Sequence, residues 1–376
     1  MYQFLYRIMG WLKGWLLIRP RSFVRLLSHK EWYDTNSYYP ELSQQRRSTC
    51  QIFLDQCHTI LKYGTPDKYY FPYGLDVKSK KAHSQYVHFD HFFKRLCYLN
   101  LSSPINCCCI LRDKMLFNIF ANGIGVSTPQ NVLYSSNRKL YSFATKKEMA
   151  ATDLLKHDDC ELFCKIVDGE CGNGIFKLTI QNGQCRVNGQ PKNVDEVWGM
   201  LTSGRYLAQS VIKQHELLAS LHPQSINTLR IVTVKSLKDG VIRVFPSILR
   251  VGTGDSIVDN TSKGGICVGI DLDSAFLKKY GFYKPQYGRK TPCHPDSGVV
   301  FENFKIPFLH QAIQQALYFH SMLPGIHSVG WDIAIGESGP IFIEGNDNWE
   351  INGPQICNGG LRALFDDYFF GQHKRM

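Results

Sequence analysis

Apolar residues recur at two different periods along this chain, and these periods predict two kinds of region. Spacings of three and four residues near the beginning, over 2–16 and 41–63, predict amphipathic helices. Later, short apolar runs bounded by turn residues predict strands over 162–167, 175–180, 184–187, 206–212, 226–234, 241–251, 265–271, 329–335 and 340–344. Further helices are expected over 78–101, 113–121, 146–156, 194–201 and 304–322.

Turn signals between these runs indicate how the strands are connected. Asn182-Gly183 predicts a tight hairpin, and Glu337-Ser338-Gly339 joins the last two strands. Strands and helices are mixed without a steady βαβ alternation, which predicts an α+β fold. The chain has 376 residues, enough for two or three lobes. We expect three regions, a mainly helical one over 1–104 and two mixed ones over 105–208 and 209–376.

Composition and charge exclude several classes of protein. Hydrophobic residues make up 44% of the chain, which excludes general disorder. The chain has no run of about 18 uncharged apolar residues, so the sequence predicts no ordinary membrane span. The net charge of +11 favours anionic partners, but six of the basic residues lie in the first 30 positions, so we expect no nucleic acid. Thirteen scattered cysteines without zinc-like spacing predict free thiols in a reducing cytoplasm.

The first thirty residues carry six cations and no acid among aromatic and aliphatic residues. Two interpretations remain open. Residues 1–27 form a helix that lies on an anionic membrane, which would place a cytoplasmic protein at the inner face of that membrane. Alternatively, they form a helix that packs on the protein body with a basic outer face, and the pattern favours this second interpretation.

The last predicted hairpin brings hard oxygen ligands together. Asp332 begins one strand and Glu344 ends the next, so an antiparallel pairing places their side chains next to each other. Asn346 lies two residues beyond Glu344 and points to the same face. Two carboxylates and an amide oxygen suit magnesium shared with nucleotide phosphates, and they do not suit zinc.

A glycine-rich turn upstream has the character of a phosphate site. Lys165 lies in the strand directly before the turn, and Gly169, Gly172 and Gly174 would let backbone N–H groups approach phosphates. The sequence is neither a Walker A loop nor a dinucleotide fingerprint. Alone, such a turn is a weak signal of phosphate binding.

Together these parts resemble a known superfamily. Lys114, Lys165, the strand over 209–212, Asp332 and Glu344-x-Asn346 occur in the order seen in ATP-grasp enzymes. The segments 225–234, 264–271 and 330–350 resemble the sugar-transfer-associated ATP-grasp family, which is related to the α-L-glutamate ligases. The likeness covers roughly residues 105–365. It implies an ATP-grasp fold, in which 105–208 and 209–376 form two α+β subdomains that clasp ATP.

The resemblance also implies a role for each matching residue. The phosphates and the adenosine of ATP would be bound by Lys114, Lys165, Gly169, Gly172, Gly174, Gln209, Ser210, Ile212 and Glu216. Two Mg²⁺ ions, with Mn²⁺ as an alternative, would be bound by Asp332, Glu344 and Asn346. Arg230 would neutralise the transferring phosphoryl group. Lys263, on a turn between strands, would close over the acceptor or remain an exposed loop lysine.

The activity implied is that of an ADP-forming carboxylate–amine ligase that acts through an acyl phosphate. Its substrates would be a small carboxylate and an amine, one of them sugar- or lipid-linked, as in the synthesis of an exopolysaccharide or capsule-type glycan. Two alternatives remain, namely a phosphotransferase that acts on a hydroxyl, and a non-catalytic basic module associated with membranes. The acid–acid–amide set favours an enzyme.

Overall fold

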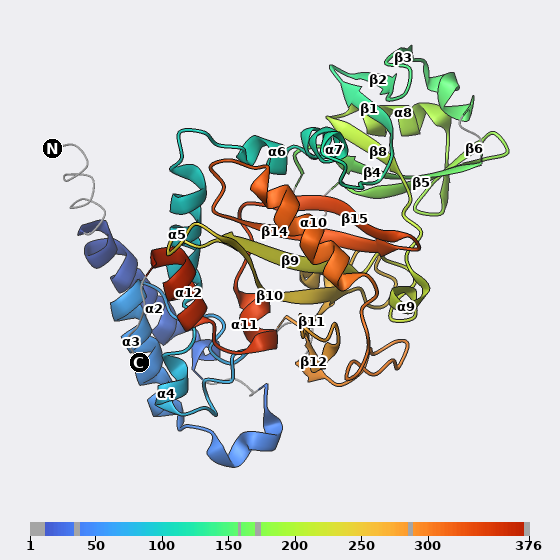
Figure 1. Ribbon diagram of the computed structural model, residues 1–376. Helices are drawn as coiled ribbons and strands as arrows, with labels where there is room; N and C mark the ends of the chain where they lie inside the picture. The colour runs from blue at the N-terminus through green and yellow to red at the C-terminus, as the bar shows by residue number, and fades with distance from the viewer. Residues whose placement is uncertain (1–11, 34–37, 157–158, 170–173, 285–288, 372–376) are drawn as a thin grey trace.

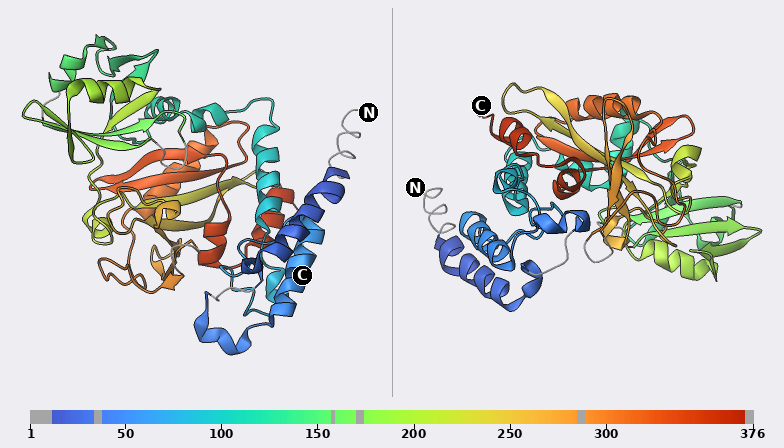
Figure 2. Two further views of the ribbon diagram at one scale, coloured as in Figure 1. Left: turned by 180° about the vertical axis from the view of Figure 1, so that it is seen from behind. Right: turned by 90° about the horizontal axis from the view of Figure 1, so that it is seen from below.

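Two antiparallel β-sheets form the body of the molecule, and a helical region lies at one end of it (Figures 1 and 2). The computed structural model describes residues 12–33, 38–156, 159–169, 174–284 and 289–371. Gly172 and positions 1–11 of the amphipathic segment therefore lie outside the described residues. The mixture of helices with antiparallel sheets confirms the predicted α+β class.

The first sheet has eight strands in the described part of the chain. Their spatial order is β3 (Glu148–Met149), β2 (Lys139–Ser142), β1 (Asn131–Ser136), β8 (Tyr206–Ser210), β4 (Cys160–Ile166), β5 (Phe176–Gln181), β6 (Gln184–Val187) and β7 (Gln190–Lys192). The β5–β6 turn at Asn182-Gly183 has φ of 51° and 67°, so the predicted tight hairpin is confirmed. Helix α8 (Val194–Thr202) packs on this sheet through Val197 and Leu201.

Seven described strands form the second sheet. Their order is β13 (Lys290–Thr291), β12 (Leu277–Phe282), β11 (Ile266–Ile270), β10 (Ile242–Val251), β9 (Thr228–Lys235), β14 (Ser328–Gly336) and β15 (Gly339–Asn346). Side chains of β9 alternate between two cores. Leu229 and Ile231 pack with helix α10 (Leu309–Ser321), whereas Val232 and Val234 pack on the opposite face.

The helical region covers that opposite face. Its α-helices are α2 (Arg19–Ser28), α3 (Thr49–Tyr63), α4 (Lys80–His83) and α5 (Phe89–Leu101). The π-helix η1 (Gly14–Ile18) and the 3₁₀ helices η2 (Lys30–Trp32) and η3 (Pro40–Gln45) belong to the same region. Helix α5 and the C-terminal helix α12 (Arg362–Phe370) enclose Trp349 and Phe245 in one apolar cluster. Helix α11 (Asn352–Asn358) packs beside β10 and β11.

Short elements outside the two sheets carry several of the predicted site residues. They are α6 (Cys108–Arg112), α7 (Lys114–Gly123), η4 (Ala151–Lys156), α9 (Glu216–Ala219) and η5 (Thr261–Lys263). The predicted boundary between residues 208 and 209 falls inside β8, which pairs with β1 and β4 in the first sheet. The division of the chain into three regions stays a prediction.

One predicted element was wrong in type. The helix expected over 146–156 is replaced by the two-residue strand β3 and by η4. Lys146 has a φ of 60°, and this left-handed conformation prevents a helix from starting there. No helix in the described part of the chain is both long enough and apolar enough to cross a bilayer. Each described cysteine is a free thiol, as the spacing predicted.

Candidate active site

Polar and charged side chains gather on one face of the second sheet. In β9 and β14, Arg230 and Asp332 alternate with buried apolar residues, so they share the face opposite α10. The register pairs Asp332 with Arg230 on one side and with Glu344 on the other. It also pairs Arg250 of β10 with Thr228 of β9. Four strands therefore deliver their polar residues to a single area.

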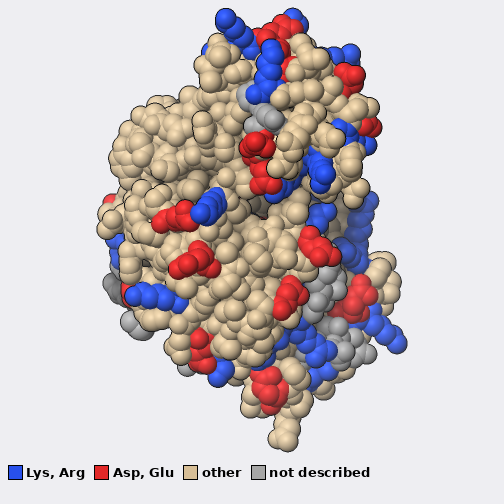
Figure 3. Space-filling model, turned by 90° about the vertical axis from the view of Figure 1, so that its right-hand side faces the viewer, with Lys and Arg blue, Asp and Glu red and all other residues tan. Residues whose placement is uncertain are grey.

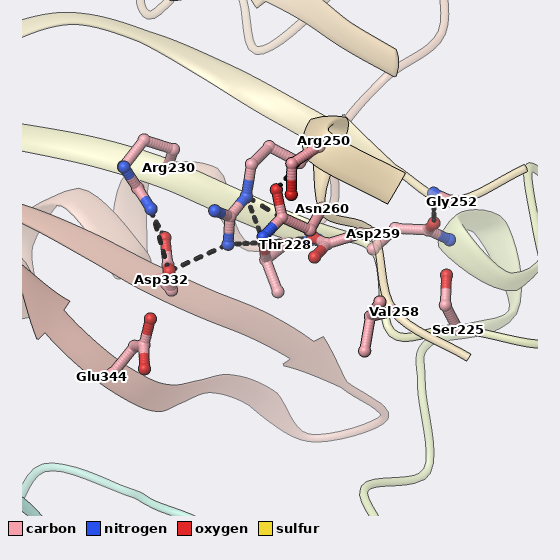
Figure 4. Close-up of polar contacts among 12 residues, drawn as sticks. Ser225, Thr228, Arg230, Arg250, Gly252, Val258, Asp259, Asn260, Asp332 and Glu344 are labelled. Atoms are coloured by element: carbon pink, nitrogen blue, oxygen red, sulfur yellow. Dashed lines mark hydrogen bonds and ion pairs between the residues drawn. The ribbon is translucent and has the colours of Figure 1, made fainter. Parts of the chain in front are cut away.

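Asp332 is the centre of this area and is only 2% exposed. Arg230 donates to both of its carboxylate oxygens, with Nε 2.5 Å from Oδ1 and Nη2 3.0 Å from Oδ2 (Figure 4). Arg250 adds Nη2 at 2.8 Å from Oδ2. Burial alone would raise the pKa of Asp332, but the two guanidinium groups hold it well below its usual range. Arg230 is thus no surface arginine.

Arg250 is a partly buried residue that the sequence did not single out. Its Nε and Nη2 donate to Thr228 Oγ1 at 3.1 and 2.9 Å, and its Nε lies 3.6 Å from Asp259 Oδ2. Asp259 in turn accepts from the backbone N–H of Thr228 at 2.9 Å and from its hydroxyl. Burial would lower the pKa of Arg250, but Asp259 and Asp332 raise it above the usual value. The one feature of the sequence that could have indicated this role is a single arginine between two apolar residues, Leu249 and Val251, which are both fully buried.

Glu344 and Asn346 complete the acidic side of the area. Asn346 Nδ2 lies 3.3 Å from Asp332 Oδ2 and 3.4 Å from Glu344 Oε1. Burial, and then the charge of Asp332, raise the pKa of Glu344, whereas Lys114 and Lys165 oppose this shift. The two adjacent carboxylates repel each other, and a cation between them would relieve this repulsion.

Two lysines face this acidic pair from elsewhere in the fold. Lys114 begins α7, where Asp113 caps the helix, and its Nζ donates to the carbonyl oxygen of Gly169. The same Nζ lies 4.0 Å from Glu344 Oε2. Lys165, in β4, is 4% exposed, and burial lowers its pKa to about 8, with Lys114 lowering it further and Glu344 opposing. Lysines in or next to the first sheet therefore lie close to acids of the second sheet.

The glycine-rich turn is described at its two ends. Gly169 accepts the hydrogen bond from Lys114, as stated above. Gly174 has a φ of +69°, and a Cβ there would lie 2.5 Å from Ile166 Cδ1, so another residue at this position would be strained. Gly172 lies outside the described residues, and its contact with phosphates stays a prediction.

The end of β8 borders a hollow of about 470 Å³. Ser210 and Ile212 line it together with Val132 and Leu162 from neighbouring strands. Gln209 does not line the hollow, because its buried amide donates to Asn131 Oδ1 at 2.7 Å. The position of the hollow beside the 209–212 segment suits the predicted adenine site.

Two predicted site residues are not brought to the charged area. Glu216 begins α9 and is exposed, and Lys263 ends η5 with an exposed side chain. Among the described residues, neither side chain has a hydrogen bond or ion pair with the cluster around Asp332. Lys263 is nevertheless close in sequence to Asp259, which belongs to that cluster.

The donor atoms present fit a hard divalent cation. In the described part of the chain no group of three or more His, Cys, Asp or Glu side chains forms a metal cluster. The available set is two carboxylates and one amide, which is oxygen chemistry typical of magnesium. Because two arginines already occupy Asp332, Glu344 has the more accessible lone pairs. Rotation of the Asn346 amide would add its Oδ1.

Comparison with known proteins gives one family match. The profile described as sugar-transfer associated ATP-grasp matches residues 93–366. No curated protein matches the chain. Similar solved structures include an N5-carboxyaminoimidazole synthetase from Staphylococcus aureus, with a TM-score of 0.39 and 10% identity over 70% of this chain and 52% of that one.

Two further structures are similar at the same low level. D-alanyl-alanine synthetase A from Vibrio cholerae has a TM-score of 0.39 and 10% identity, over 69% of this chain and 65% of that one. An L-amino acid ligase from Bacillus licheniformis has a TM-score of 0.36 and 9% identity, over 69% and 48%. The chain thus spans about half to two thirds of the length of these three enzymes.

Proposed function

Because this chain belongs to the sugar-transfer associated ATP-grasp family, we propose that it is an ADP-forming ligase that joins a carboxylate to an amine. Family membership confirms the resemblance seen in the sequence and assigns the two-sheet body to the ATP-grasp fold. The observation that carries the proposal is the meeting of Lys114 and Lys165 with Glu344 and the arginine-bound Asp332. This arrangement pairs a phosphate-binding charge with metal-binding acids.

The chemistry requires such an arrangement. A carboxylate is a poor electrophile, so it must be activated before an amine attacks it. A carboxylate oxygen attacks the γ-phosphorus of ATP, and the bond between this phosphorus and the β-phosphate oxygen breaks. ADP departs, and the carboxylate is now an acyl phosphate. The amine then attacks the acyl carbon and loses a proton, and inorganic phosphate leaves. One C–N bond forms for each ATP consumed.

The residues of the cluster have distinct roles in these two reaction steps. Lys114 and Lys165 hold the phosphates of ATP through their positive charges. Arg230 and Arg250 lie on the other side of the acids, where they stabilise charge on the transferring group and hold Asp332 ionised. The preorganised cluster needs little rearrangement as charge develops.

Mg²⁺ would be held by Glu344, Asn346 and the remaining lone pairs of Asp332. When bound, it would offset the negative charge of the polyphosphate and of the phosphoryl group in transfer. The closeness of the two carboxylates, which raises the pKa of Glu344, supports this assignment. The same closeness favours a divalent over a monovalent cation, since two acids require more than one charge.

The substrates are proposed from the family description. "Sugar-transfer associated" supports a sugar- or glycan-linked intermediate as one substrate, with an amino acid or small amine as the other. Polysaccharide synthesis of the exopolysaccharide or capsule type is the corresponding process. The carboxylate and the amine are defined only by their chemical classes.

Product analysis with the Glu344→Gln variant tests the proposed function. The wild-type chain with Mg-ATP, a carboxylate and an amine should release ADP and inorganic phosphate, and omission of either substrate should stop the release. Glu344→Gln should lower this rate by about a hundredfold or more, because the amide would bind Mg²⁺ more weakly than the carboxylate, and this ion would offset the charge on the phosphoryl group. Glu337→Gln, on the exposed turn of the same hairpin, should retain activity.

The identity of the products separates the alternatives. AMP and pyrophosphate would show adenylation and contradict the acyl-phosphate route. A stable phosphorylated product without free phosphate would show a phosphotransferase. Full activity of the Glu344→Gln variant would show that the acidic pair has no role in the mechanism.

A further inference from the structure

Helix α2 packs on the protein body through only one of its faces. Arg19 Nε donates to the carbonyl oxygen of Leu61 at 3.0 Å, and Ser22 Oγ donates to that of Gly64 at 2.8 Å. Leu26, on the same face, is fully buried. These contacts fix the helix on α3 and determine which of its side chains remain outside.

The opposite face of this segment is apolar and exposed. Leu16, Val24 and Leu27 are 68%, 65% and 66% exposed, although burial of each side chain would be favourable. With Leu17 and Pro20 they recur at helical spacing, and we call these five residues the outer stripe. A single exposed leucine needs no explanation, but a stripe of this length on one helix face indicates an interaction surface.

Cations surround the outer stripe, and acids are absent from it. Lys13, Arg21, Arg25 and Lys30 lie in the same segment, and residues 12–30 contain no Asp or Glu. On the supporting helix α3, Asp55 is paired with Arg47. The surface therefore combines exposed aliphatic side chains with an excess of basic residues.

We propose that the outer stripe docks this protein on an anionic lipid surface. Aliphatic side chains would enter the boundary between headgroups and acyl chains, while the flanking lysine and arginine side chains reach anionic headgroups. A second copy of the chain is a poor occupant, since two such surfaces would bring like charges together. The sequence left open a helix packed on the body with a basic outer face, and the packed helix observed here has an outer face that is also apolar.

The outer stripe lies far from the first sheet (Figures 1 and 2). Helix α2 lies at the end of the molecule away from the first sheet in all three ribbon views (Figures 1 and 2). Docking through α2 would therefore hold the protein at the membrane without covering the first sheet. This inference does not depend on the proposed function, because it concerns a separate surface.

Vesicle flotation of the full chain tests the proposal. The wild-type chain should float with vesicles of phosphatidylcholine plus phosphatidylglycerol, and high salt should weaken this binding. Val24→Glu/Leu27→Glu should lower the partition coefficient by about a hundredfold, because two aliphatic side chains no longer enter the bilayer. Lys13→Ala/Arg21→Ala should lower it by about tenfold on these vesicles and leave binding to pure phosphatidylcholine unchanged.

A matched control carries the same charge change on exposed apolar residues elsewhere. Val300→Glu/Met322→Glu should float like the wild type, and equal thermal unfolding of all variants shows that each is folded. Flotation of Val24→Glu/Leu27→Glu at the wild-type level would overturn the proposal, as would failure of the wild type to float. A lipid-free dimer that Val24→Glu/Leu27→Glu converts to a monomer would identify a second copy as the occupant and overturn it too.

Discussion

At the scale of single residues, Asp332 keeps its charge in a nearly solvent-free position because two guanidinium groups share it. Arg230 contributes a two-point contact from the neighbouring strand, and Arg250 reaches the same carboxylate from one strand further away. Arg250 also binds Thr228 and approaches Asp259, so it links two buried acids. Such a network is stable only when every member is present.

Arg250→Met tests this linkage. Its loss would leave Asp259 without a counter-charge and Asp332 with only one, so we expect the free energy of unfolding to fall by about 3–5 kcal/mol. Urea unfolding measures this change. Arg243→Met, which breaks an exposed pair with Asp239, should leave the midpoint nearly unchanged. Equal midpoints for both variants would show that Arg250 is not a structural link.

Lys165 predicts a pH dependence of ATP binding. Burial lowers its pKa from 10.5 to about 8 in the folded chain. Between these values the unfolded chain binds more protons, so the contribution of Lys165 to stability rises with pH across this window. The neutral amine, however, no longer attracts phosphate. Mg-ATP affinity measured by calorimetry should therefore decrease as the pH rises above about 8.

Two variants test whether Lys165 causes this pH dependence. Lys165→Arg keeps its charge at these pH values, so its Mg-ATP affinity should not show the decrease. Lys177→Arg, on the neighbouring strand β5 and partly exposed, should keep the wild-type profile. A decrease that persists in Lys165→Arg would mean that another group titrates.

At the scale of secondary-structure elements, the β14–β15 hairpin and strand β9 determine the geometry of the site. The two-residue turn at Glu337-Ser338 fixes the register that places Asp332 opposite Glu344. Gly330, two residues before Asp332, leaves space for the side chain of Arg230. A Cβ at Gly330 would lie 2.7 Å from Trp349 Cβ and 3.2 Å from Arg230 Cδ.

Gly330→Ala should therefore displace Arg230 or Trp349. Overpacking of this kind costs about 1–3 kcal/mol, and urea unfolding should show a decrease of that size. Gly123→Ala, in α7, introduces a methyl group into open space and should not destabilise the chain. If Gly330→Ala unfolds like the wild type, the close packing around Arg230 is not rigid.

The elements that could be predicted are those with a strong local signal. The apolar runs and the Asn182-Gly183 turn located β4, β5 and β6 to within two residues. Strands β2, β7 and β12 were not predicted, because they are short or partly polar and depend on their neighbours for pairing. The helices α11 and α12 were also missed, since no segment after 350 was assigned.

The same distinction applies to the site. Asp332 and Glu344 could be paired from sequence because one short turn separates their strands, which leaves a single register. Arg250 could not be placed, because its contact with Asp332 depends on the registers of both β10 with β9 and β9 with β14. Long-range pairings of this kind are set by the packing of the whole sheet, so no local pattern reveals them.

At the scale of the whole molecule, the fold brings opposite charges from distant segments to one area. Lys165 belongs to the first sheet and Glu344 to the second, and Lys114 lies at the start of the helix between them. On the outer surface seen in Figure 3, by contrast, cations and acids are interspersed. The net charge of +11 is therefore not a single patch on that face.

Titration of Mg-ATP into the wild type, Lys165→Met and Glu344→Gln tests the central claim most directly. Removal of the buried charge in Lys165→Met relieves desolvation, so the variant should remain folded. We predict that the wild type binds Mg-ATP with a rise in the thermal midpoint and that both variants, one from each sheet, lose most of this rise. Absence of the rise in the wild type, or an undiminished rise in either variant, would contradict a single nucleotide site between the two sheets.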